Sequence, residues 1–260
     1  MIFELLDSIP VAFFYVGVFM LMLVFCEIGY QIGERGLSRQ DKDASTSLGP
    51  MVGGLLAMLA FVLAFTFSLA SSQHDIRKKN VLDEANSIGT AFLRADLIDK
   101  QHGSEVKRLL REYVNIRLKA ASGSDINIAL AKSVEIQNLL WAHVSSAALE
   151  RPGTNSSLMI QAANDVIDMH EKRVTGALRN RIPGSIWIAL FAITALTMIT
   201  IGTQVGYTSK RRLVAVIPML MAFAVLVTLV VDLNRPQSGL ITVGQQSVVA
   251  LQKSMSSETK

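Results

Sequence analysis

The segment LGPMVGGLLAMLAFVLAFTFSLASS, residues 48–72, decides the fold of this chain. It contains no charged residue and is longer than the roughly 20 apolar residues with which a helix spans a bilayer. Its glycines and alanines leave little side-chain bulk along one side, whereas Phe61, Phe65 and Phe67 fill other directions. Small residues let helices approach each other closely in a membrane. The segment therefore predicts a transmembrane helix that packs against other helices.

Three further stretches have the same length and apolar character, namely residues 10–33, 184–207 and 213–231. Half of the 260 residues are hydrophobic and 18% are charged, compared with about 25% charged residues in soluble domains. A purely soluble protein is excluded. Residues 1–9 contain no Lys or Arg, so they lack the positive region of a cleaved secretory signal, and we expect residues 10–33 to be retained as a membrane helix.

The connection between the second and third apolar stretches, residues 73–183, is long enough for one small domain. Between residues 55 and 97 there is no proline and Gly89 is the only glycine, so the second membrane helix should continue beyond the bilayer as one rod. Apolar residues recur at helical spacing around 106–117, over 125–149 and from about 154 onward. Arg117 is assigned to the charged face of its helix, and His170 to the apolar face of its own.

The sequence thus predicts an all-α integral membrane protein with four transmembrane helices and a four-rod helical domain inserted between the second and third. We expect a first transmembrane hairpin at 1–72, an extramembrane helical bundle at 73–183, a second transmembrane hairpin at 184–233 and a C-terminal tail at 234–260. In the tail, a short element at 240–243 should precede an amphipathic segment that reaches Met255. A bend or a new helix start is expected at Pro183.

The charge pattern gives two opposing indications of topology. The short loops 34–47 and 208–212 hold six Lys and Arg residues, whereas the two tails together hold two, which predicts cytoplasmic loops with the N-terminus and the helical domain extracytoplasmic. Basic residues that flank the large domain close to the bilayer favour the reverse. Because long loops translocate largely regardless of charge, we keep the first assignment, in a bacterial inner membrane.

The sequence contains no recognisable catalytic motif. It has no phosphate-binding loop, dinucleotide fingerprint, HExxH pair or nucleophile elbow, so we expect no catalytic residues, no bound cofactor and no enzyme activity. The one cysteine, Cys26, excludes an intrachain disulfide. The four histidines, at 74, 102, 143 and 170, look scattered, without metal-ligand spacing, and no metal site is expected. The net charge of +4 does not indicate a nucleic acid partner.

Three sets of polar residues are candidates for an ion pathway or a buried polar network. Glu27 lies in an apolar run, where an ionisable residue is costly; it either reaches the interface, pairs with a Lys or Arg, or belongs to a pathway. The second membrane helix carries the hydroxyls Thr66, Ser68, Ser71 and Ser72. Beyond the bilayer, the series Glu84, Asn86, Thr90, Arg94 and Asp96 predicts a buried polar network, with Glu84 paired to Arg94 or to a residue such as Arg111 or Arg117.

Five blocks of the sequence resemble the bacterial bestrophin-like family of membrane proteins. They are residues 55–57 with 65–68, 84–97, 109–114 with 117–118, 179–183 with 186–187, and 235–236 with 239–241 and 243. Bestrophins are pentameric anion channels with four membrane helices per subunit and a helical cytosolic part, so the resemblance implies a channel and a cytosolic domain. The chain shows no match to the aromatic-rich bestrophin neck or to an acidic calcium clasp, so neither anion selectivity nor calcium gating is implied.

Two hypotheses follow. The first is an oligomeric membrane channel or channel-like pore, in which several copies of the chain surround the pathway because one four-helix subunit has no obvious pore. The second is a structural or sensory membrane protein, whose extracytoplasmic bundle signals through a protein partner. Both place the chain in a lipid bilayer.

Overall fold

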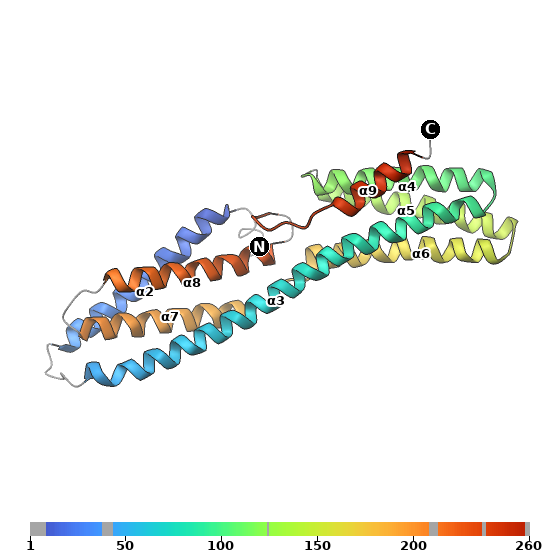
Figure 1. Ribbon diagram of the computed structural model, residues 1–260. Coiled ribbons are helices and arrows are strands. Elements are labelled where there is room, and N and C mark those ends of the chain that lie inside the picture. The colour runs from blue at the N-terminus through green and yellow to red at the C-terminus, as the bar shows by residue number, and fades with distance from the viewer. Residues whose placement is uncertain (1–8, 38–43, 124, 208–212, 236–237, 258–260) are drawn as a thin grey trace. The chain divides into compact units, whose positions relative to one another are not determined.

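The computed structural model describes residues 9–37, 44–123, 125–207, 213–235 and 238–257, and in these residues it is helical with no strand. Eight α-helices follow one another there (Figure 1): α2 (Val11–Leu37), α3 (Ala44–Arg94), α4 (Lys100–Ala121), α5 (Ile126–Glu150), α6 (Thr154–Val174), α7 (Gly184–Tyr207), α8 (Leu213–Asn234) and α9 (Gln246–Ser257). The predicted all-α class is confirmed. Several loop residues counted for topology, at 38–43 and 208–212, lie outside the described residues.

Four helical segments are long and apolar enough to cross a membrane: Val11–Arg35, Leu48–Leu97, Thr154–Tyr207 and Val216–Asn234. They contain the four stretches chosen from the sequence, apart from a few terminal residues. The second belongs to α3, which is one continuous helix of 51 residues, as the unbroken pattern predicted. The chain is therefore a multi-pass membrane protein.

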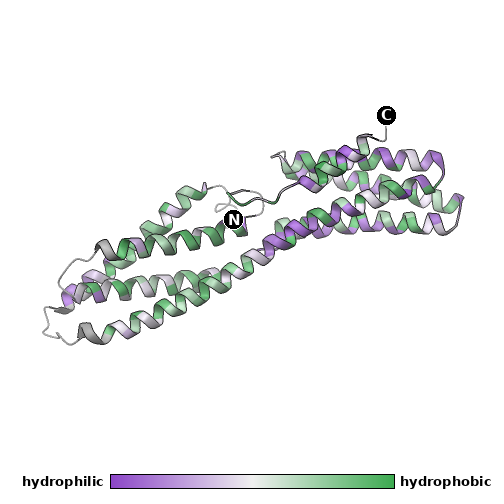
Figure 2. Cartoon of the chain, viewed as in Figure 1, coloured by the Kyte–Doolittle hydropathy of each residue, from purple (hydrophilic) through white to green (hydrophobic). Residues whose placement is uncertain are grey.

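The contacts divide the chain into two compact units. The first, here called the membrane unit, comprises Met1–His74 and Arg181–Thr242; the second, the helical unit, comprises Asp75–Asn180 and Val243–Lys260. The α3 helix contributes to both units, and the C-terminal tail is divided between them. Hydropathy differs between the units (Figure 2). The helices of the membrane unit are mainly hydrophobic, whereas hydrophilic and hydrophobic residues alternate along the helices of the helical unit.

In the membrane unit, α2 and α7 pack closely through glycines on both helices. A Cβ atom on Gly29 would meet the carbonyl oxygen of Ile199, and one on Gly202 would meet the carbonyl oxygen of Cys26. Gly33 and Gly206 make equivalent approaches one turn further along. The pair Gly29 and Gly33 thus has a matching pair four residues apart on α7, as in other close helix contacts in membranes.

The helical unit is built from the C-terminal part of α3 with α4, α5, α6 and α9. Its core is apolar and includes Ile88, Leu110, Leu140, Met159 and Val166, all at most 1% exposed. The α9 helix joins this core through Val248 and Met255. The carboxylates of Asp99 and Asp125 accept backbone N–H groups at the starts of α4 and α5, which are ordinary N-terminal caps.

The chain leaves regular α-helix between α6 and α7, around Pro183. A π-helical turn, Thr175–Arg179, follows α6, and α7 begins at Gly184, so the predicted new start after Pro183 is confirmed.

The prediction of a short element at 240–243 was wrong, because no regular structure forms there. Instead, the buried Asp232 carboxylate accepts the backbone N–H groups of Leu240 and Ile241 at 3.0–3.1 Å.

Gly239 makes this turn possible, and its replacement should destabilise the membrane unit. Its φ is +132°, and a Cβ there would meet the Asp232 carboxylate. Gly239→Ala should therefore cost about 2 kcal/mol of unfolding free energy, measured as a lower melting temperature in detergent. Gly244→Ala is the control, because a Cβ at Gly244 meets nothing within 4 Å. Equal melting temperatures would show that the turn does not depend on Gly239.

Candidate functional site

The membrane-spanning part of α3 has a buried face and an exposed face. Thr66 is fully buried and its hydroxyl donates to the Val62 carbonyl at 2.7 Å, so it faces the subunit's own core. Ser68 and Ser72 are exposed, and Ser71 is half-buried. The four hydroxyls named from the sequence therefore do not share one face.

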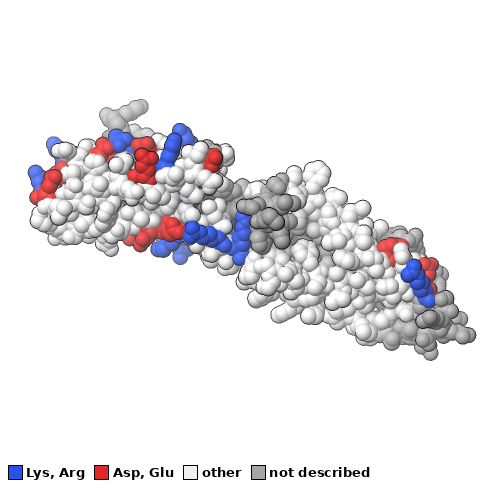
Figure 3. Space-filling view, turned by 180° about the vertical axis from the view of Figure 1, so that it is seen from behind, with Lys and Arg blue, Asp and Glu red and all other residues white. Residues whose placement is uncertain are grey.

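The exposed face continues along α3 at helical spacing. Ala57, Phe61, Ala64, Ser68 and Ser72 succeed one another at intervals of three or four residues, and all are exposed. On the face of the membrane unit in Figure 3, the described residues are almost without charge over most of the surface, with Lys, Arg, Asp and Glu gathered towards an end. The hydroxyls of Ser68 and Ser72 on α3 are therefore polar groups that the subunit itself does not cover.

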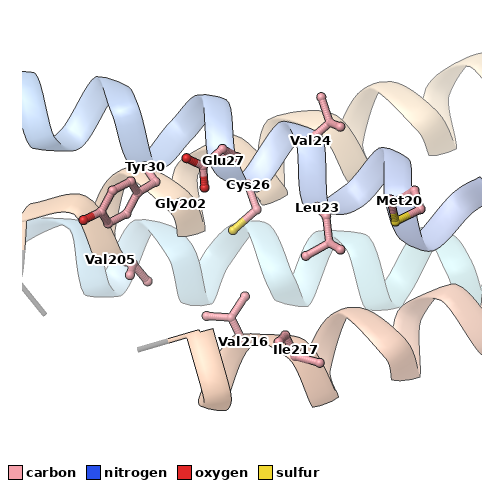
Figure 4. A pocket seen from close by; sticks show the side chains of 10 residues that line it. All are labelled: Met20, Leu23, Val24, Cys26, Glu27, Tyr30, Gly202, Val205, Val216 and Ile217. Carbon is pink, nitrogen blue, oxygen red and sulfur yellow. The ribbon is translucent and has the colours of Figure 1, made fainter. Parts of the chain in front are cut away.

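Glu27 lies elsewhere in the membrane unit, on α2. It is half-buried and lines a pocket with Cys26, Tyr30 and residues of α7 and α8 (Figure 4). Neither this pocket nor the polar one beside it contains a residue of α3. Glu27 and the α3 hydroxyls thus belong to different sites.

The helical unit contains a buried ion-pair cluster around Glu84, which is 0% exposed. Glu84 Oε1 lies 3.0 Å from Arg117 Nε, and Glu84 Oε2 pairs with Arg173 Nη1. The Arg117 N–H is not aligned for a hydrogen bond, so that contact is electrostatic. Through Nη2, Arg173 also donates to Gln245 Oε1 at 2.6 Å, which ties the segment before α9 to the cluster.

Tyr113 and His170 complete the cluster. The Tyr113 hydroxyl donates to Glu84 Oε1 at 3.1 Å, so it can only accept from His170 Nδ1, 3.0 Å away. This arrangement assigns the proton of neutral His170 to Nδ1. Burial, together with the Glu84 charge, raises the pKa of Tyr113 well above its ordinary value, which keeps the hydroxyl neutral.

The electrostatics of the cluster keep His170 neutral. Burial, with a further contribution from Arg117 and a smaller one from Arg173, lowers the pKa of His170 to about 4, although Glu84 and Glu171 oppose the shift. A protonated His170 would add a third positive charge beside a single carboxylate. The cluster therefore consists of one carboxylate, two guanidinium groups and two neutral rings, with an excess of positive charge.

The structure does not bring the other members of the predicted network to Glu84. Arg94 Nη1 donates to the Leu158 carbonyl at 2.9 Å, and Asp96 is exposed and pairs with Lys107 at 2.6 Å. Asn86 and Thr90 are exposed. Arg117 is one of the partners named for Glu84, but its assignment to a charged outer face was wrong, because it is buried. The single buried network inferred along this helix is thus replaced by a cluster between helices.

The description of the histidines as scattered also needs correction. His102 Nδ1 lies 3.2 Å from His143 Nδ1, and His102 Nε2 lies 3.4 Å from Glu150 Oε1. Among the described residues, no group of three or more His, Cys, Asp or Glu side chains is placed to hold a metal ion.

Sequence reasoning did not find Tyr113, His170 and Arg173 as partners of Glu84, yet part of the signal was present. Tyr113 and His170 are polar groups on otherwise apolar helix faces, and Arg117 and Arg173 follow them by four and three residues. Spacings of three or four residues place side chains on the same helix face. Because buried polar groups need hydrogen-bond partners, polar residues on an apolar helix face predict a buried polar cluster.

The lowered pKa of His170 predicts a specific pH dependence of stability. Between pH 6.5 and about 4 the unfolded chain binds a proton that folded His170 does not, so the stability present above pH 6.5 is lost as the pH falls through this window. The loss is roughly 3 kcal/mol. His170→Gln should flatten this part of the pH profile of the unfolding free energy, measured by chemical unfolding. His74→Gln, outside the cluster, should leave the wild-type profile unchanged. A wild-type profile that is flat over this window would contradict the assignment.

These features define a class: a multi-pass helical membrane protein whose second spanning helix bears an uncovered hydroxyl-containing face and whose helical unit holds a buried ion-pair cluster. The family model described as Bestrophin-like domain matches residues 16–248. The chain therefore belongs to the bestrophin-like family. No curated protein and no solved structure matches the chain.

Proposed function

We propose that this protein is an oligomeric membrane channel or channel-like pore, in which several copies surround a pathway lined by the exposed face of α3. Membership of the bestrophin-like family and the apolar helices are consistent with a channel-like membrane protein. In this proposal, the part of the chain at 73–183 is a four-rod helical domain inserted between two transmembrane hairpins.

The observation that carries the proposal is the exposure of Ser68 and Ser72 on a membrane-spanning helix. Polar groups in a membrane-spanning segment usually face a bundle interior or a water-filled cavity. Small residues on the same face, such as Ala57 and Ala64, would let neighbouring copies approach closely. A closed ring of copies would convert this face into the lining of a pore.

The channel proposal is tested on the purified protein. In detergent, the protein should elute as a homo-oligomer by light scattering, and reconstituted bilayers should show conductance that changes with the salt used. A protein that stays monomeric, or bilayers that carry no current under varied ions and voltages, would contradict the proposal. A pull-down from membranes that recovers a stoichiometric partner, together with absent conductance, would instead favour the sensory alternative.

The proposed orientation places the helical domain outside the cytoplasm of a bacterial inner membrane. Cysteines introduced at Asp125 and at Ser209 report on the two sides when intact cells meet an impermeant thiol reagent. We expect the cysteine at 125 to react and the one at 209 to be shielded. The opposite pattern would place the helical domain in the cytoplasm and would show that the charges flanking the domain set the topology.

A further inference from the structure

A pair of histidines, His102 and His143, links α4 to α5 within the helical unit. His102 lies in the first turn of α4, and His143 lies about two turns before the end of α5. The two helices form a hairpin whose connection is at the other end, so the histidine pair joins its open end. The two Nδ1 atoms are 3.2 Å apart, and the ring planes are tilted by 59° to each other. In this hydrogen bond one Nδ1 carries the proton that the other accepts.

The spacing of the two Nδ1 atoms also suits two ligands of one metal ion. In a tetrahedral zinc site, with Zn–N bonds of about 2.0–2.1 Å, two ligating nitrogens lie about 3.3 Å apart. Imidazole is a preferred ligand of zinc, copper and nickel, whereas magnesium and calcium prefer oxygen ligands. A zinc ion would therefore replace the shared proton with little change in the distance between the two helices, once each ring tilts to aim its lone pair at the ion.

Glu150, at the end of α5, orients one of the two rings. Its Oε1 lies 3.4 Å from His102 Nε2, and the His102 side chain is only 12% exposed. Histidines that bind metals usually donate their other ring N–H to a carboxylate, which fixes the tautomer and the direction of the ring. A proton on Nε2 that is held by Glu150 leaves a lone pair on Nδ1. The contact with Glu150 thus prepares His102 as a metal ligand.

The charges around the histidine pair favour a cation. Asp99 Oδ1 accepts the backbone N–H of His102 at 2.9 Å. Hydrogen bonds from Arg108, with a smaller contribution from His143, lower the pKa of Glu105, so this carboxylate is ionised near the second ring. Three carboxylates therefore lie around the pair, those of Asp99, Glu105 and Glu150. Their negative charge offsets part of the cost of placing a divalent ion between the two rings.

We propose that His102 and His143 bind one Zn²⁺ ion through their Nδ1 atoms, with Glu150 holding the His102 ring and water molecules filling the other coordination positions. Closed structural zinc sites have four protein ligands, so a site with two is an exchangeable one. The bound ion clamps the open end of the α4–α5 hairpin when zinc is available. The site lies wholly within the helical unit and does not depend on the channel proposal.

The proposal is tested by titrating Zn²⁺, and separately Mg²⁺, onto the full-length protein in detergent and counting bound ions by native mass spectrometry. The wild type should bind one Zn²⁺ per chain and no Mg²⁺ at the same concentration. The double variant His102→Gln/His143→Gln should bind Zn²⁺ more than about tenfold more weakly. His74→Gln, at a histidine on α3, is the control and should bind Zn²⁺ as the wild type does. Equal Zn²⁺ binding by the double variant and the wild type would identify adventitious ions only and overturn the proposal.

A second pair of variants tests the site without removing a ligand. Glu150→Gln should weaken Zn²⁺ binding about tenfold, because it removes the acceptor charge behind His102. Glu135→Gln, at another exposed carboxylate on α5, should not change it. Glu150 is 65% exposed, so its replacement leaves the core intact and this comparison holds even if the histidine variants fail to fold. Equal Zn²⁺ affinities of Glu150→Gln and Glu135→Gln would also contradict the proposal.

Discussion

Glu84→Ala should lower the stability of the protein by about 3 to 5 kcal/mol. The change removes the one carboxylate of the buried cluster and leaves Arg117 and Arg173, 7% and 11% exposed, without their counter-charge. It also takes away the acceptor of the Tyr113 hydroxyl. In a chain of this size, the loss corresponds to a melting temperature lower by roughly 10 °C, measured by thermal unfolding in detergent.

Two comparisons make this prediction specific to the cluster. Asp75→Ala, at an exposed carboxylate on the same helix, should change the unfolding free energy by under about 1 kcal/mol. Arg173→Met should cost less than Glu84→Ala, because Glu84 keeps Arg117 and Tyr113 as partners. Equal melting temperatures for Glu84→Ala and Asp75→Ala would mean that Glu84 is exposed in solution. A loss of conductance with unchanged stability would give Glu84 a role in the pathway.

Gly29→Ala should have an effect of similar size in the membrane unit. The added methyl group would meet the backbone carbonyl of Ile199, which cannot rotate away as a flexible side chain could. The α2 and α7 helices would have to separate and lose the packing made by both glycine pairs, at a cost of about 3 kcal/mol. The measurement is again the melting temperature in detergent, with a decrease of roughly 10 °C expected.

Gly17→Ala is the matched control on the same helix, because a Cβ at Gly17 meets nothing within 4 Å. Alanine favours helix formation by about 1 kcal/mol over glycine, so this variant should be neutral or slightly more stable. If Gly29→Ala and Gly17→Ala melt together, the close contact of α2 with α7 does not exist in the folded protein.

The elements that could be predicted from the sequence are those set by local pattern. Apolar runs of membrane-spanning length indicated the four spans, and helical spacing with Gly123 and Pro152 as breaks indicated α4, α5 and α6. These features depend on neighbours within a few turns, which one sequence contains. The short element expected at 240–243 does not form, because Asp232, at the end of the preceding helix, accepts the backbone N–H groups of Leu240 and Ile241.

The sites were less predictable because they depend on contacts between distant segments. Arg117 could be named as a partner of Glu84, but Arg173, 89 residues away, could not, since no local pattern relates the two. The pocket beside Glu27 arises from the packing of α2, α7 and α8, and its shape is absent from any one helix. Thr66 is buried and Ser68 is exposed because the neighbouring helices cover only one side of α3, and the sequence does not show which side that is.

The most direct test of the proposed pore is modification of single cysteines on α3 in a Cys26→Ala background while current is recorded. Ser68→Cys lies on the exposed face, whereas Thr66→Cys, two residues away, lies on the buried face and serves as its control. A positively charged methanethiosulfonate reagent should block most of the current through the Ser68→Cys channel and leave that of Thr66→Cys unchanged. Current that is insensitive to modification at position 68, or equally sensitive at both positions, would contradict a pathway lined by the exposed face of α3.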